Sequence, residues 1–484
     1  MSYGETVMKM QELFRGIEIL ETNVSGDLEI SGVKYSSRQV LPGEMFVAIV
    51  GYETDGHKYI PDAIHRGASV ILCQKDMPED TPWIRVASTR RALAQLGANW
   101  YGHPAEAMKM VGITGTNGKT SVTYLLKSML ETQGAKVGLI GTICNLIGDE
   151  ELPTERTTPE SFELQGILAQ MRDKGCTHVV MEVSSHALYL NRTATIPFTV
   201  GAFTNLTEDH LDFHETMENY RQAKSLLFSQ CDQGVFNLAD PTTPKMMAEA
   251  KCACCTFGAG GDIWAENVVL ESDHVEMDVR EGNFTGRLRI GIPGRFTVSN
   301  SLMAFAIGRK LGMDFHTAIE ALSQAKGVKG RVEVVPTPGK DYTVLIDYAH
   351  TPDGLENVLR SVKDFAKGRV ILVFGCGGDR DRKKRPLMGE IGVKYADITI
   401  VTSDNPRTEE PMSIIEDILE GMKNSFKTYI VEENRRKAIA LALRLGQKDD
   451  MIILAGKGHE TYQIIGKEKT HLDEREEVAA ALWP

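Results

Sequence analysis

The chain has 484 residues, and its 54 lysine and arginine residues against 66 aspartate and glutamate residues give a formal net charge of −12. At roughly 100–200 residues per domain, this length predicts about three domains and excludes a single small binding module. The acidic balance and the lack of a long basic run argue against nucleic acid as a partner. A hydrophobic content of 42% argues against both a disordered chain and insertion into a membrane.

The first residues carry charges where a secretory signal needs an apolar core, so we expect a cytoplasmic protein. Eight cysteines are too few for a disulfide framework in a chain of this length, and we expect reduced thiols. Cys252, Cys254 and Cys255 have no Cys or His pair at zinc-site spacing nearby. We interpret this group as part of a strand of small residues.

The expected elements follow an α/β pattern from the start. Short apolar stretches at 45–50 and 68–73, separated by turn residues, predict a small N-terminal α/β domain. After a linker at 101–104, a strand at 110–114 leads into a glycine loop and a helix at 122–133. Further strands at 136–140, 178–183 and 200–204, with a helix at 161–174, predict a parallel sheet with helices on both faces.

A third region repeats this alternation. We expect strands at 343–346, 370–374, 398–402, 427–431 and 451–454, with helices at 354–365 and 411–423. The sequence therefore predicts three α/β domains: a small one at 1–103, a central P-loop parallel-sheet domain at 104–329 and a Rossmann-like domain at 330–484. In open α/β sheets, ligands bind beyond the carboxyl ends of the strands, where GCGGDRD, TSDNPR and AGKGHE fall.

The strongest local motif is the glycine loop between strand and helix. Backbone N–H groups of such a loop favour phosphate, while the lysine reaches the β- and γ-phosphates and the threonine hydroxyl binds Mg²⁺. The common pattern would place a glycine at position 113, where this chain has Ile113, so the loop is a variant. The alternative is a plain glycine turn in a βα unit. The residues expected to bind ATP here are Gly115, Thr116, Asn117, Gly118, Lys119 and Thr120.

Two further polar segments begin where an apolar strand stops. Glu182 could hold a metal that bridges the nucleotide phosphates, and His210 could supply a further metal ligand. Taken singly, each is slightly better explained as a helix cap or a solvated loop residue. Together with the phosphate loop, they favour an active site that uses ATP and Mg²⁺.

The motifs, taken in order, resemble the Mur ligases of peptidoglycan synthesis from about residue 36 to residue 460. The motifs that carry the resemblance are GTNGKT, EVSSH, TNLTEDHLDFH, YRQAK, DYAHTPDGLE, GCGGDRD, DNPRTEEP and AGKGHE. The resemblance implies an ATP-dependent amide ligase that acts on small molecules. It would add meso-2,6-diaminopimelate to the D-glutamate of UDP-N-acetylmuramoyl-L-alanyl-D-glutamate through an acyl phosphate. We expect a monomer, with no nucleic-acid or membrane partner.

The resemblance also implies roles for single residues. Lys119, Lys224 and His210 would be catalytic, and Lys224 would carry a carbamate that joins Thr120, Glu182 and His210 as a metal ligand. An unmodified Lys224 would instead be a surface lysine or a phosphate contact. Ser37 and the 51–54 loop would form the uridine-nucleotide site of the UDP-linked substrate, and Thr157, Thr158, Ser184 and Arg192 would contact its muramoyl dipeptide. The remaining nucleotide-facing positions would be Asn300, Arg331, Asp347 and His350, and the amino-acid site would comprise Arg380, Asp404, Asn405, Pro406, Arg407, Gly456 and Glu460.

The identity of the amine depends largely on Arg407. Diaminopimelate carries one carboxylate more than lysine, and a planar guanidinium is the side chain best shaped to bind that group with two hydrogen bonds. Glu460 would meet the distal ammonium. The alternatives are a folylpolyglutamate synthase from the same superfamily, a nucleotide switch whose ATP state gates a partner, and a structural protein. Because the phosphate and amino-acid ligands lie in different domains, we also expect domain movement.

Overall fold

The computed structural model describes residues 7–51, 54–78, 80–154, 156–423 and 425–482. The chain forms two compact units, one comprising residues 1–123 and 130–256 and the other residues 124–129 and 257–484. The expected mixed α/β fold with parallel-rich sheets is confirmed. Of the helices in the described ranges, none combines the length and apolar character that a membrane-spanning segment needs.

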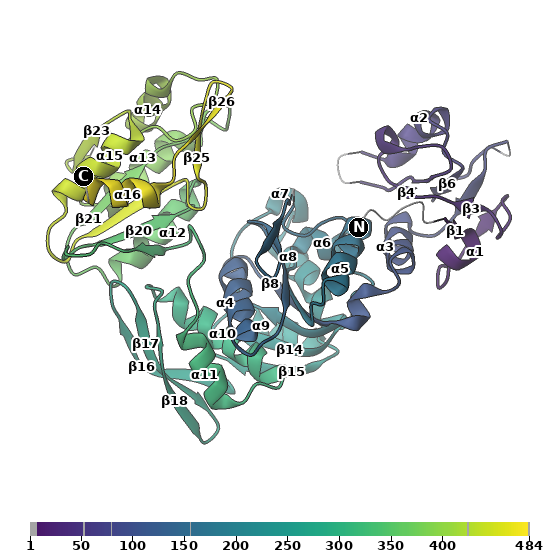
Figure 1. Ribbon diagram of the computed structural model, residues 1–484, viewed down its shortest axis with the longest axis horizontal. Coiled ribbons are helices and arrows are strands. Elements are labelled where there is room, and N and C mark those ends of the chain that lie inside the picture. The colour runs from purple at the N-terminus through teal and green to yellow at the C-terminus, as the bar shows by residue number, and fades with distance from the viewer. Residues whose placement is uncertain (1–6, 52–53, 79, 155, 424, 483–484) are drawn as a thin grey trace. The chain divides into compact units, whose positions relative to one another are not determined.

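The first unit begins with a five-stranded sheet in the order β2-β7-β6-β5-β4 (Figure 1). Strands β4 to β7 are parallel, and β2 is antiparallel at the edge. The strands of this region are β1 (Met8–Lys9), β2 (Glu21–Thr22), β3 (Glu29–Ile30), β4 (Val33–Lys34), β5 (Met45–Val47), β6 (Val70–Cys73) and β7 (Trp83–Arg85). Its helices are α1 (Met10–Leu13), α2 (Ile60–His65) and α3 (Thr89–Trp100).

The same unit holds the predicted P-loop sheet, in the order β11-β10-β9-β12-β8-β13-β14-β15. Parallel pairs join β9 to β12, β12 to β8, β8 to β13 and β13 to β14. The strands are β8 (Lys109–Thr114), β9 (Val137–Ile140), β10 (Asn145–Ile147), β11 (Glu150–Leu152), β12 (His178–Glu182), β13 (Phe198–Phe203), β14 (Cys231–Asn237) and β15 (Ala253–Phe257). The helices are α4 (Lys119–Thr132), α5 (Ser161–Asp173), α6 (Ser185–Tyr189), α7 (Leu211–His214), α8 (Met217–Ser225) and α9 (Thr243–Glu249).

The second unit begins with an antiparallel ribbon that the sequence did not reveal. It comprises β16 (Ile263–Leu270), β17 (Val275–Glu281) and β18 (Phe284–Ile290). Helices α10 (Phe296–Lys310) and α11 (Phe315–Ser323) pack against it. Gly286 of β18 allows this packing, since a Cβ there would meet the Phe315 ring at 2.9 Å.

The rest of the second unit is the expected Rossmann-like sheet, in the order β19-β20-β24-β21-β22-β23 (Figure 1). All pairs are parallel except that of β19 with β20. The strands are β19 (Glu333–Val335), β20 (Thr343–Asp347), β21 (Val370–Phe374), β22 (Ile398–Val401), β23 (Thr428–Val431) and β24 (Met451–Ala455), followed by the hairpin β25 (Tyr462–Ile465) and β26 (Glu468–His471). The helices are α12 (Pro352–Lys363), α13 (Lys384–Tyr395), α14 (Pro411–Glu420), α15 (Arg435–Leu445) and α16 (Glu474–Leu482).

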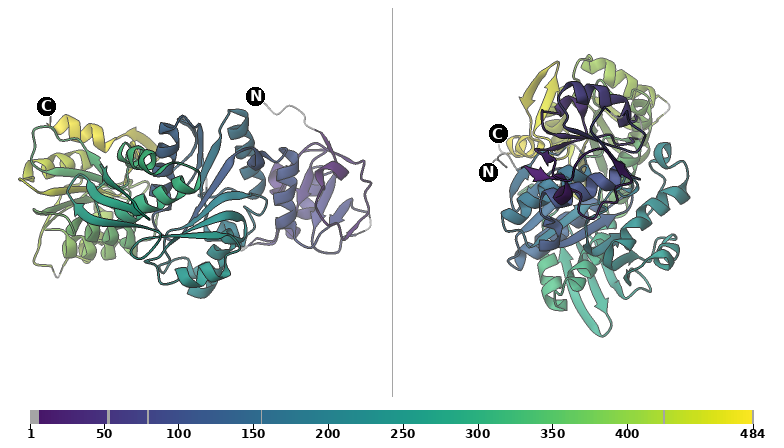
Figure 2. Two further views of the ribbon diagram at one scale, coloured as in Figure 1. Left: turned by 90° about the horizontal axis from the view of Figure 1, so that it is seen from below. Right: turned by 90° about the vertical axis from the view of Figure 1, so that its right-hand side faces the viewer.

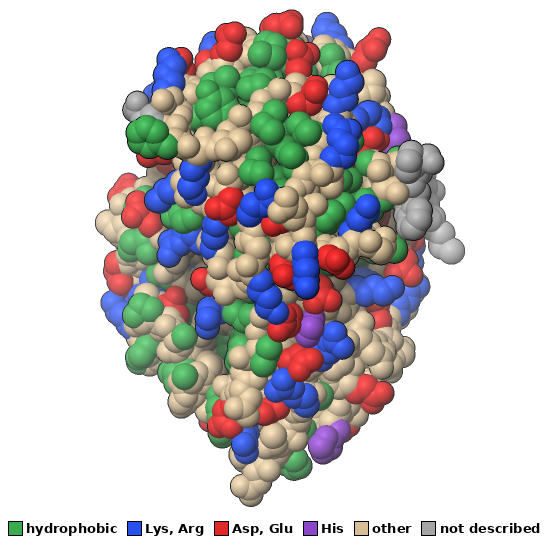
Figure 3. All heavy atoms as spheres, turned by 90° about the vertical axis from the view of Figure 1, so that its left-hand side faces the viewer, with side chains coloured by type: hydrophobic (Ala, Val, Ile, Leu, Met, Phe, Trp, Pro, Cys, Tyr) green, Lys and Arg blue, Asp and Glu red, His purple; other side chains and the backbone are tan. Residues whose placement is uncertain are grey.

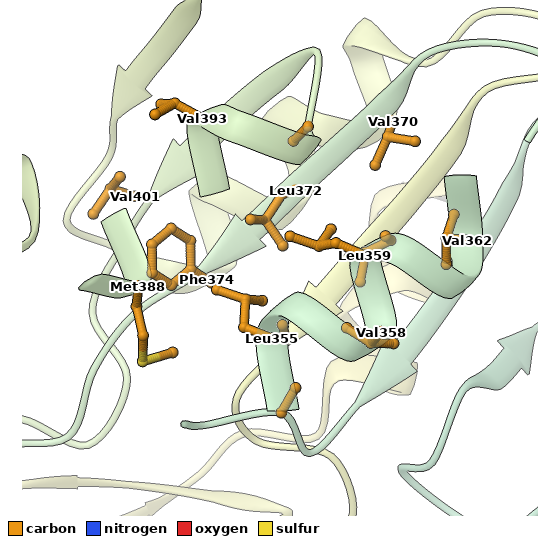
Figure 4. Packing of buried hydrophobic residues seen from close by; sticks show 14 of the residues in the cluster. Leu355, Val358, Leu359, Val362, Val370, Leu372, Phe374, Met388, Val393 and Val401 are labelled. Atoms are coloured by element: carbon orange, nitrogen blue, oxygen red, sulfur yellow. The ribbon is translucent and has the colours of Figure 1, made fainter. Parts of the chain in front are cut away.

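Helices cover both faces of this sheet (Figure 2), and the alternation of side chains along β21 shows why. Val370, Leu372 and Phe374 pack with α12 and α13 on one face (Figure 4). Ile371 and Val373 pack with α15 and α16 on the other. A strand that is buried on both faces is apolar throughout, which is why its sequence was readable as a parallel strand.

A fully buried ion pair ties α15 to α16 and to the end of β24. Arg435 Nε donates to Glu474 Oε1 at 2.8 Å, and Nη2 donates to the Ala455 carbonyl at 2.9 Å. Both charged side chains have 0% exposure. Removing one partner of such a pair leaves an uncompensated buried charge.

We predict that Arg435→Met lowers the free energy of unfolding by about 3–5 kcal/mol, because Glu474 then remains charged and unpaired inside the protein. Denaturant unfolding of the full chain measures this. The double variant Arg435→Met with Glu474→Leu should recover most of the loss. A single variant as stable as the parent would contradict this role of the pair.

Candidate active site

The register of three parallel strands brings the polar loops of the first unit together. Strand β8 lies between β12 and β13, with Ile113 opposite Glu182 and Thr114 opposite Phe203. The glycine loop after β8 therefore starts beside the residues that follow both neighbouring strands. This is the carboxyl edge of the sheet, where ligands are expected in this class of fold.

The segment after β13 fixes the shape of the phosphate loop. The Thr116 N–H donates to the Asn205 carbonyl at 2.8 Å, and the Asn117 N–H donates to Asn205 Oδ1 at 3.0 Å. Gly115 has φ +140°, and a Cβ there would lie 1.8 Å from Thr204 Oγ1. Position 115 therefore needs glycine both for its backbone conformation and for this close approach.

Two lysines converge on the backbone carbonyl of Gly115. Lys119 Nζ and Lys224 Nζ each donate to it at 2.9 Å. Lys224 is only 1% exposed, and its ammonium lies 4.4 Å from the centre of the Tyr220 ring. Burial, reinforced by the charge of Lys119, holds the pKa of Lys224 well below its usual value. The structure thus excludes the alternative that Lys224 is a helix-surface lysine.

Glu182 is brought to the phosphate loop as expected. Thr120 Oγ1 donates to Glu182 Oε1 at 3.0 Å, and the Thr142 N–H and hydroxyl donate to the two carboxylate oxygens, each at 3.0 Å. Within the described ranges, no three His, Cys, Asp or Glu side chains are arranged as a metal site. Glu182 and the Thr120 hydroxyl nevertheless offer the oxygen atoms that Mg²⁺ takes from proteins when phosphates and water complete its coordination.

His210 belongs to a cluster of aromatic rings. It has a left-handed backbone with φ 53°, its side chain is 47% exposed, and its ring lies 4.8 Å from that of His186. His214 is buried beside them and accepts or donates a hydrogen bond with Ser185 Oγ at 2.9 Å. Burial, aided by the neighbouring cations, lowers the pKa of His214 to about 4. No hydrogen bond or ion pair in the described part of the chain joins His210 to Glu182.

The side chains expected to contact the muramoyl dipeptide in the central region do lie together. Thr158 Oγ1 donates to the Glu182 carbonyl at 2.9 Å and accepts from the Ser184 N–H at 3.1 Å. Arg192 Nη1 donates to the Thr158 carbonyl at 3.1 Å. The Thr157 hydroxyl lies 3.0 Å from that of Thr142, which also binds Glu182.

Sequence reasoning missed Glu160, which anchors this group. Its Oε2 lies 3.3 Å from both Arg192 Nε and Arg90 Nη1, and Arg90 also donates to the Val50 carbonyl at 2.7 Å. The only signal was its place two residues after Thr158 and just before a helix. Glu160 therefore links the dipeptide residues to the N-terminal sheet region within the same unit.

Ser37 lies beside this junction. It is buried in a short 3₁₀ turn at Ser37–Gln39, and Tyr35 just before it donates from its hydroxyl to Glu163 Oε1 of α5. A cavity of about 460 Å³ opens next to this turn. Among its lining residues are Gln39, Tyr101, Asn145, Arg156 and Glu163. Of the expected 51–54 loop, Tyr52 and Glu53 lie outside the described residues.

The second unit brings together most of the remaining nucleotide-facing positions. Asp347 is buried at the end of β20 and accepts from the N–H groups of Val332 and Ala349, both at 2.8 Å. Burial raises its pKa against the opposing pull of Arg331. His350 Nδ1 lies 2.9 Å from the Tyr348 carbonyl. Asn300 lies in α10, and the described contacts include no hydrogen bond or ion pair between it and these residues.

The expected amino-acid site forms at the ends of β22 and β24. Asn405 Nδ2 donates to Glu460 Oε2 at 2.9 Å. The ammonium of Lys457 lies within ion-pair distance of both Asp404 and Glu460. The Gly456 N–H donates to the Asp347 carbonyl at 3.0 Å. Pro406 packs closely on Gly378, where a Cβ would lie 1.9 Å from the Pro406 carbonyl oxygen.

Arg407 has a left-handed backbone with φ 52°. In the described part of the chain, only some of the N–H groups of its guanidinium donate hydrogen bonds. Nη1 donates to the Gly378 carbonyl at 2.8 Å. In the part of the chain that the structure describes, no carboxylate lies within ion-pair distance of this guanidinium. Arg380 flanks the same glycine turn, since a Cβ on Gly377 would lie 2.8 Å from Arg407 Nη1 and 3.9 Å from Arg380 Cγ.

Two further residues of this site were not predicted. Lys457 lies inside the AGKGHE motif and is fully buried among Asp404, Asn405 and Glu460. Glu409, in DNPRTEEP, binds the Arg385 guanidinium through two hydrogen bonds of 2.8 and 2.9 Å. Both sit within motifs that the sequence had marked, but burial of a lysine or a carboxylate is set by tertiary structure.

Comparison with known families matches three consecutive ranges of the chain. Residues 29–101 match the Mur ligase family catalytic domain, residues 113–308 the Mur ligase middle domain and residues 330–458 the Mur ligase glutamate ligase domain. The chain belongs to the Mur ligase family. Each matched range lies inside one of the three predicted domains, whose boundaries stay a prediction.

Relatives within the family cover nearly the whole chain. It is 45% identical to UDP-N-acetylmuramoyl-L-alanyl-D-glutamate–2,6-diaminopimelate ligase of Clostridium tetani, over 97% of this chain and 98% of the relative. A solved structure of a ligase of that name has a TM-score of 0.74 at 28% identity, with 99% of both chains covered. Folylpolyglutamate synthase of Mycobacterium tuberculosis shares the fold, with a TM-score of 0.60 at 16% identity over 76% of this chain and 92% of that one.

We predict that Gly115→Ala abolishes ATP binding, because the added Cβ would collide with Thr204 Oγ1 and reshape the phosphate loop. Calorimetric titration with ATP measures the loss. Gly134→Ala is the matched control, since Gly134 also has a positive φ but no atom within 4 Å of an added Cβ. ATP binding by Gly115→Ala at the parent's affinity would show that this loop does not hold the nucleotide.

Proposed function

We propose that this Mur ligase joins meso-2,6-diaminopimelate to the D-glutamate of UDP-N-acetylmuramoyl-L-alanyl-D-glutamate at the expense of ATP. The observation that carries the proposal is the Arg407 guanidinium, which donates to the carbonyls of Gly378 and Asn405 and has no carboxylate within ion-pair distance among the described residues. An amino acid with a second carboxylate supplies the missing partner. The names of the relatives that match nearly the full chain support the same assignment.

The first step is phosphoryl transfer. A carboxylate oxygen of D-glutamate attacks the γ-phosphorus of ATP. The bond from this phosphorus to the oxygen that bridges it to the β-phosphate breaks. ADP departs, and the product is an acyl phosphate. Two anions must approach each other, so the barrier is mainly electrostatic. The ammonium group of Lys119 places positive charge at the phosphate loop, and Thr158, Ser184 and Arg192 orient the dipeptide.

The second step forms the amide. The amine nitrogen of diaminopimelate attacks the acyl carbon, phosphate leaves with one oxygen of the former carboxylate, and the nitrogen loses a proton to solvent. Neither step needs a nucleophilic side chain. The side chains of the second unit serve to bind the amino acid, with Arg407 on its distal carboxylate and Glu460 near its distal ammonium.

Mg²⁺ fits the oxygen donors of Thr120 and Glu182, and we assign His210 as a further ligand. When bound, the ion neutralises charge on the phosphates. In its ammonium form, Lys224 would repel a cation at the phosphate loop. Addition of CO₂ to Lys224 removes that conflict, because the neutral amine becomes a carbamate anion and releases a proton. The low pKa that burial imposes on Lys224 favours the neutral amine this addition needs.

The family acts on small molecules, and we propose that this chain works as a cytoplasmic monomer. On the face drawn in Figure 3, basic and acidic side chains are interspersed. This mixed charge is typical of a soluble surface.

The assay that tests the function is phosphate release from ATP with the UDP-muramoyl dipeptide and, in turn, diaminopimelate, lysine or no amine. Of these three conditions, only the one with diaminopimelate is expected to give rapid phosphate release. Release that ignores the dipeptide would instead indicate a nucleotide switch. Release with a folate acceptor in place of the dipeptide would indicate a folate ligase.

We predict that Arg407→Lys lowers kcat/KM for diaminopimelate about 10- to 100-fold, since an ammonium cannot bind a carboxylate in two-pronged fashion. The KM for ATP should not change. Arg382→Lys is the control, because Arg382 lies on the neighbouring loop and pairs with Asp417 at the surface. Equal kinetics for Arg407→Lys and the parent would remove Arg407 from the amino-acid site.

We also predict that the parent protein takes up one CO₂ on Lys224. Isotope-labelled bicarbonate should give a carbamate signal in carbon NMR, and Lys224→Gln should lack both the signal and turnover. Lys119→Gln should lose turnover but keep the signal, because it leaves the Lys224 amine in place. A parent that is fully active in CO₂-free solution would contradict the carbamate.

A further inference from the structure

The buried ammonium of Lys457 contacts three residues of the expected amino-acid site. Lys457 has 0% exposure, and its Nζ donates to Asn405 Oδ1 and Glu460 Oε2, both at 3.1 Å. The same nitrogen lies 3.8 Å from Asp404 Oδ1. Lys457 therefore donates two hydrogen bonds within the site, and Asp404 lies within ion-pair distance of the same ammonium.

The contacts of Asn405 show that this arrangement also fixes the loop. Its Oδ1 accepts from Lys457 and from the Ile464 N–H at 3.0 Å, while its Nδ2 donates to Glu460 at 2.9 Å. The Arg407 N–H in turn donates to the Ile464 carbonyl at 3.1 Å. Lys457, Asn405 and β25 thus set where Glu460 and Arg407 can point.

We propose that Lys457 is a positioning residue that also sets amine selectivity, an inference that rests on the function proposed above. Its charge offsets the carboxylates of Asp404 and Glu460. The distal end of diaminopimelate is a zwitterion without net charge, whereas the distal end of lysine carries one positive charge. Removal of the Lys457 charge therefore makes the site more negative and favours lysine over diaminopimelate.

The charge of Arg435 does not replace that of Lys457. Arg435 is another fully buried cation that interacts electrostatically with Asp404 and Glu460, and it is already paired with Glu474. Lys469 offers a matched control. Its Nζ lies 3.6 Å from the centre of the Tyr462 ring, which Lys457 Nζ also faces at 5.6 Å, yet Lys469 is exposed and touches none of the three site residues.

The test compares kcat/KM for diaminopimelate and for lysine in the full chain, with ATP and the UDP-muramoyl dipeptide. Because both amines are assayed on the same preparation, their ratio does not depend on the folded fraction. In Lys457→Gln the ratio should fall about tenfold or more, as expected for one charge removed at an effective dielectric of about 20. Lys457→Arg and Lys469→Gln should keep the parent's ratio, and the KM for ATP should stay constant in all of them.

A fall in both kcat/KM values by the same factor would overturn the proposal, since it would assign Lys457 a purely structural role. Failure of both Lys457 variants to fold would overturn it for the same reason. Product formation by the parent protein distinguishes a failure of this inference from a failure of the proposed function. If the parent itself makes no product with diaminopimelate, the function is wrong, whereas an active parent with an unaltered ratio in Lys457→Gln refutes only the role of Lys457.

Discussion

The convergence of two lysine side chains, Lys119 and the buried Lys224, on one backbone carbonyl is the constraint on which the first unit depends. Lys119 and Lys224 both donate to the Gly115 oxygen, although like charges repel and Lys224 is buried. Burial and the Lys119 charge lower the pKa of Lys224, which favours its neutral amine and hence the proposed reaction with CO₂. The glycine at position 115, the clamp from Asn205 and the register of β8 with its neighbours all maintain this convergence.

In the second unit, the like charges that lie close together are negative. Here Asp404 and Glu460 lie at the ends of two strands, and the Lys457 ammonium keeps these carboxylates close together. Arg407 is left with backbone carbonyls as partners. The unit thus presents a guanidinium with unused donors next to an organised acidic group, which suits an amino-acid end that carries both a carboxylate and an ammonium.

Much of this could be predicted because the informative residues are local in sequence. The apolar run of β21 is buried on both faces, so its sequence alone indicated a parallel strand. The strand around Cys255 was also predicted and is confirmed as β15. The ribbon β16–β18 was missed because its strands mix charged and apolar residues, with a register shift between Glu266 and Val269.

The residues of the candidate site likewise divide into those that the sequence could predict and those that it could not. Thr120 and Glu182 could be paired in advance because strand ends in a parallel sheet meet at one edge. Glu160 and Lys457 could not, because nothing in a sequence distinguishes a buried, bonded charge from a solvated one. Glu409 could not either, because its partner Arg385 is set by the tertiary structure. His210 lies among aromatic rings with Asp209 3.4 Å from its Nε2, and nothing joins it to Glu182 in the described part of the chain, so its role as a metal ligand stays a prediction.

The most direct test of the cationic phosphate loop is the fate of the D-glutamate carboxylate oxygens. A dipeptide labelled with a heavy oxygen isotope in that carboxylate is turned over with ATP and diaminopimelate, and the released phosphate is examined by mass spectrometry. If the loop drives phosphoryl transfer to the carboxylate, one labelled oxygen per turnover appears in the phosphate. Phosphate without label, formed together with the amide product, would contradict an acyl phosphate and with it the role assigned to Lys119 at the phosphate loop.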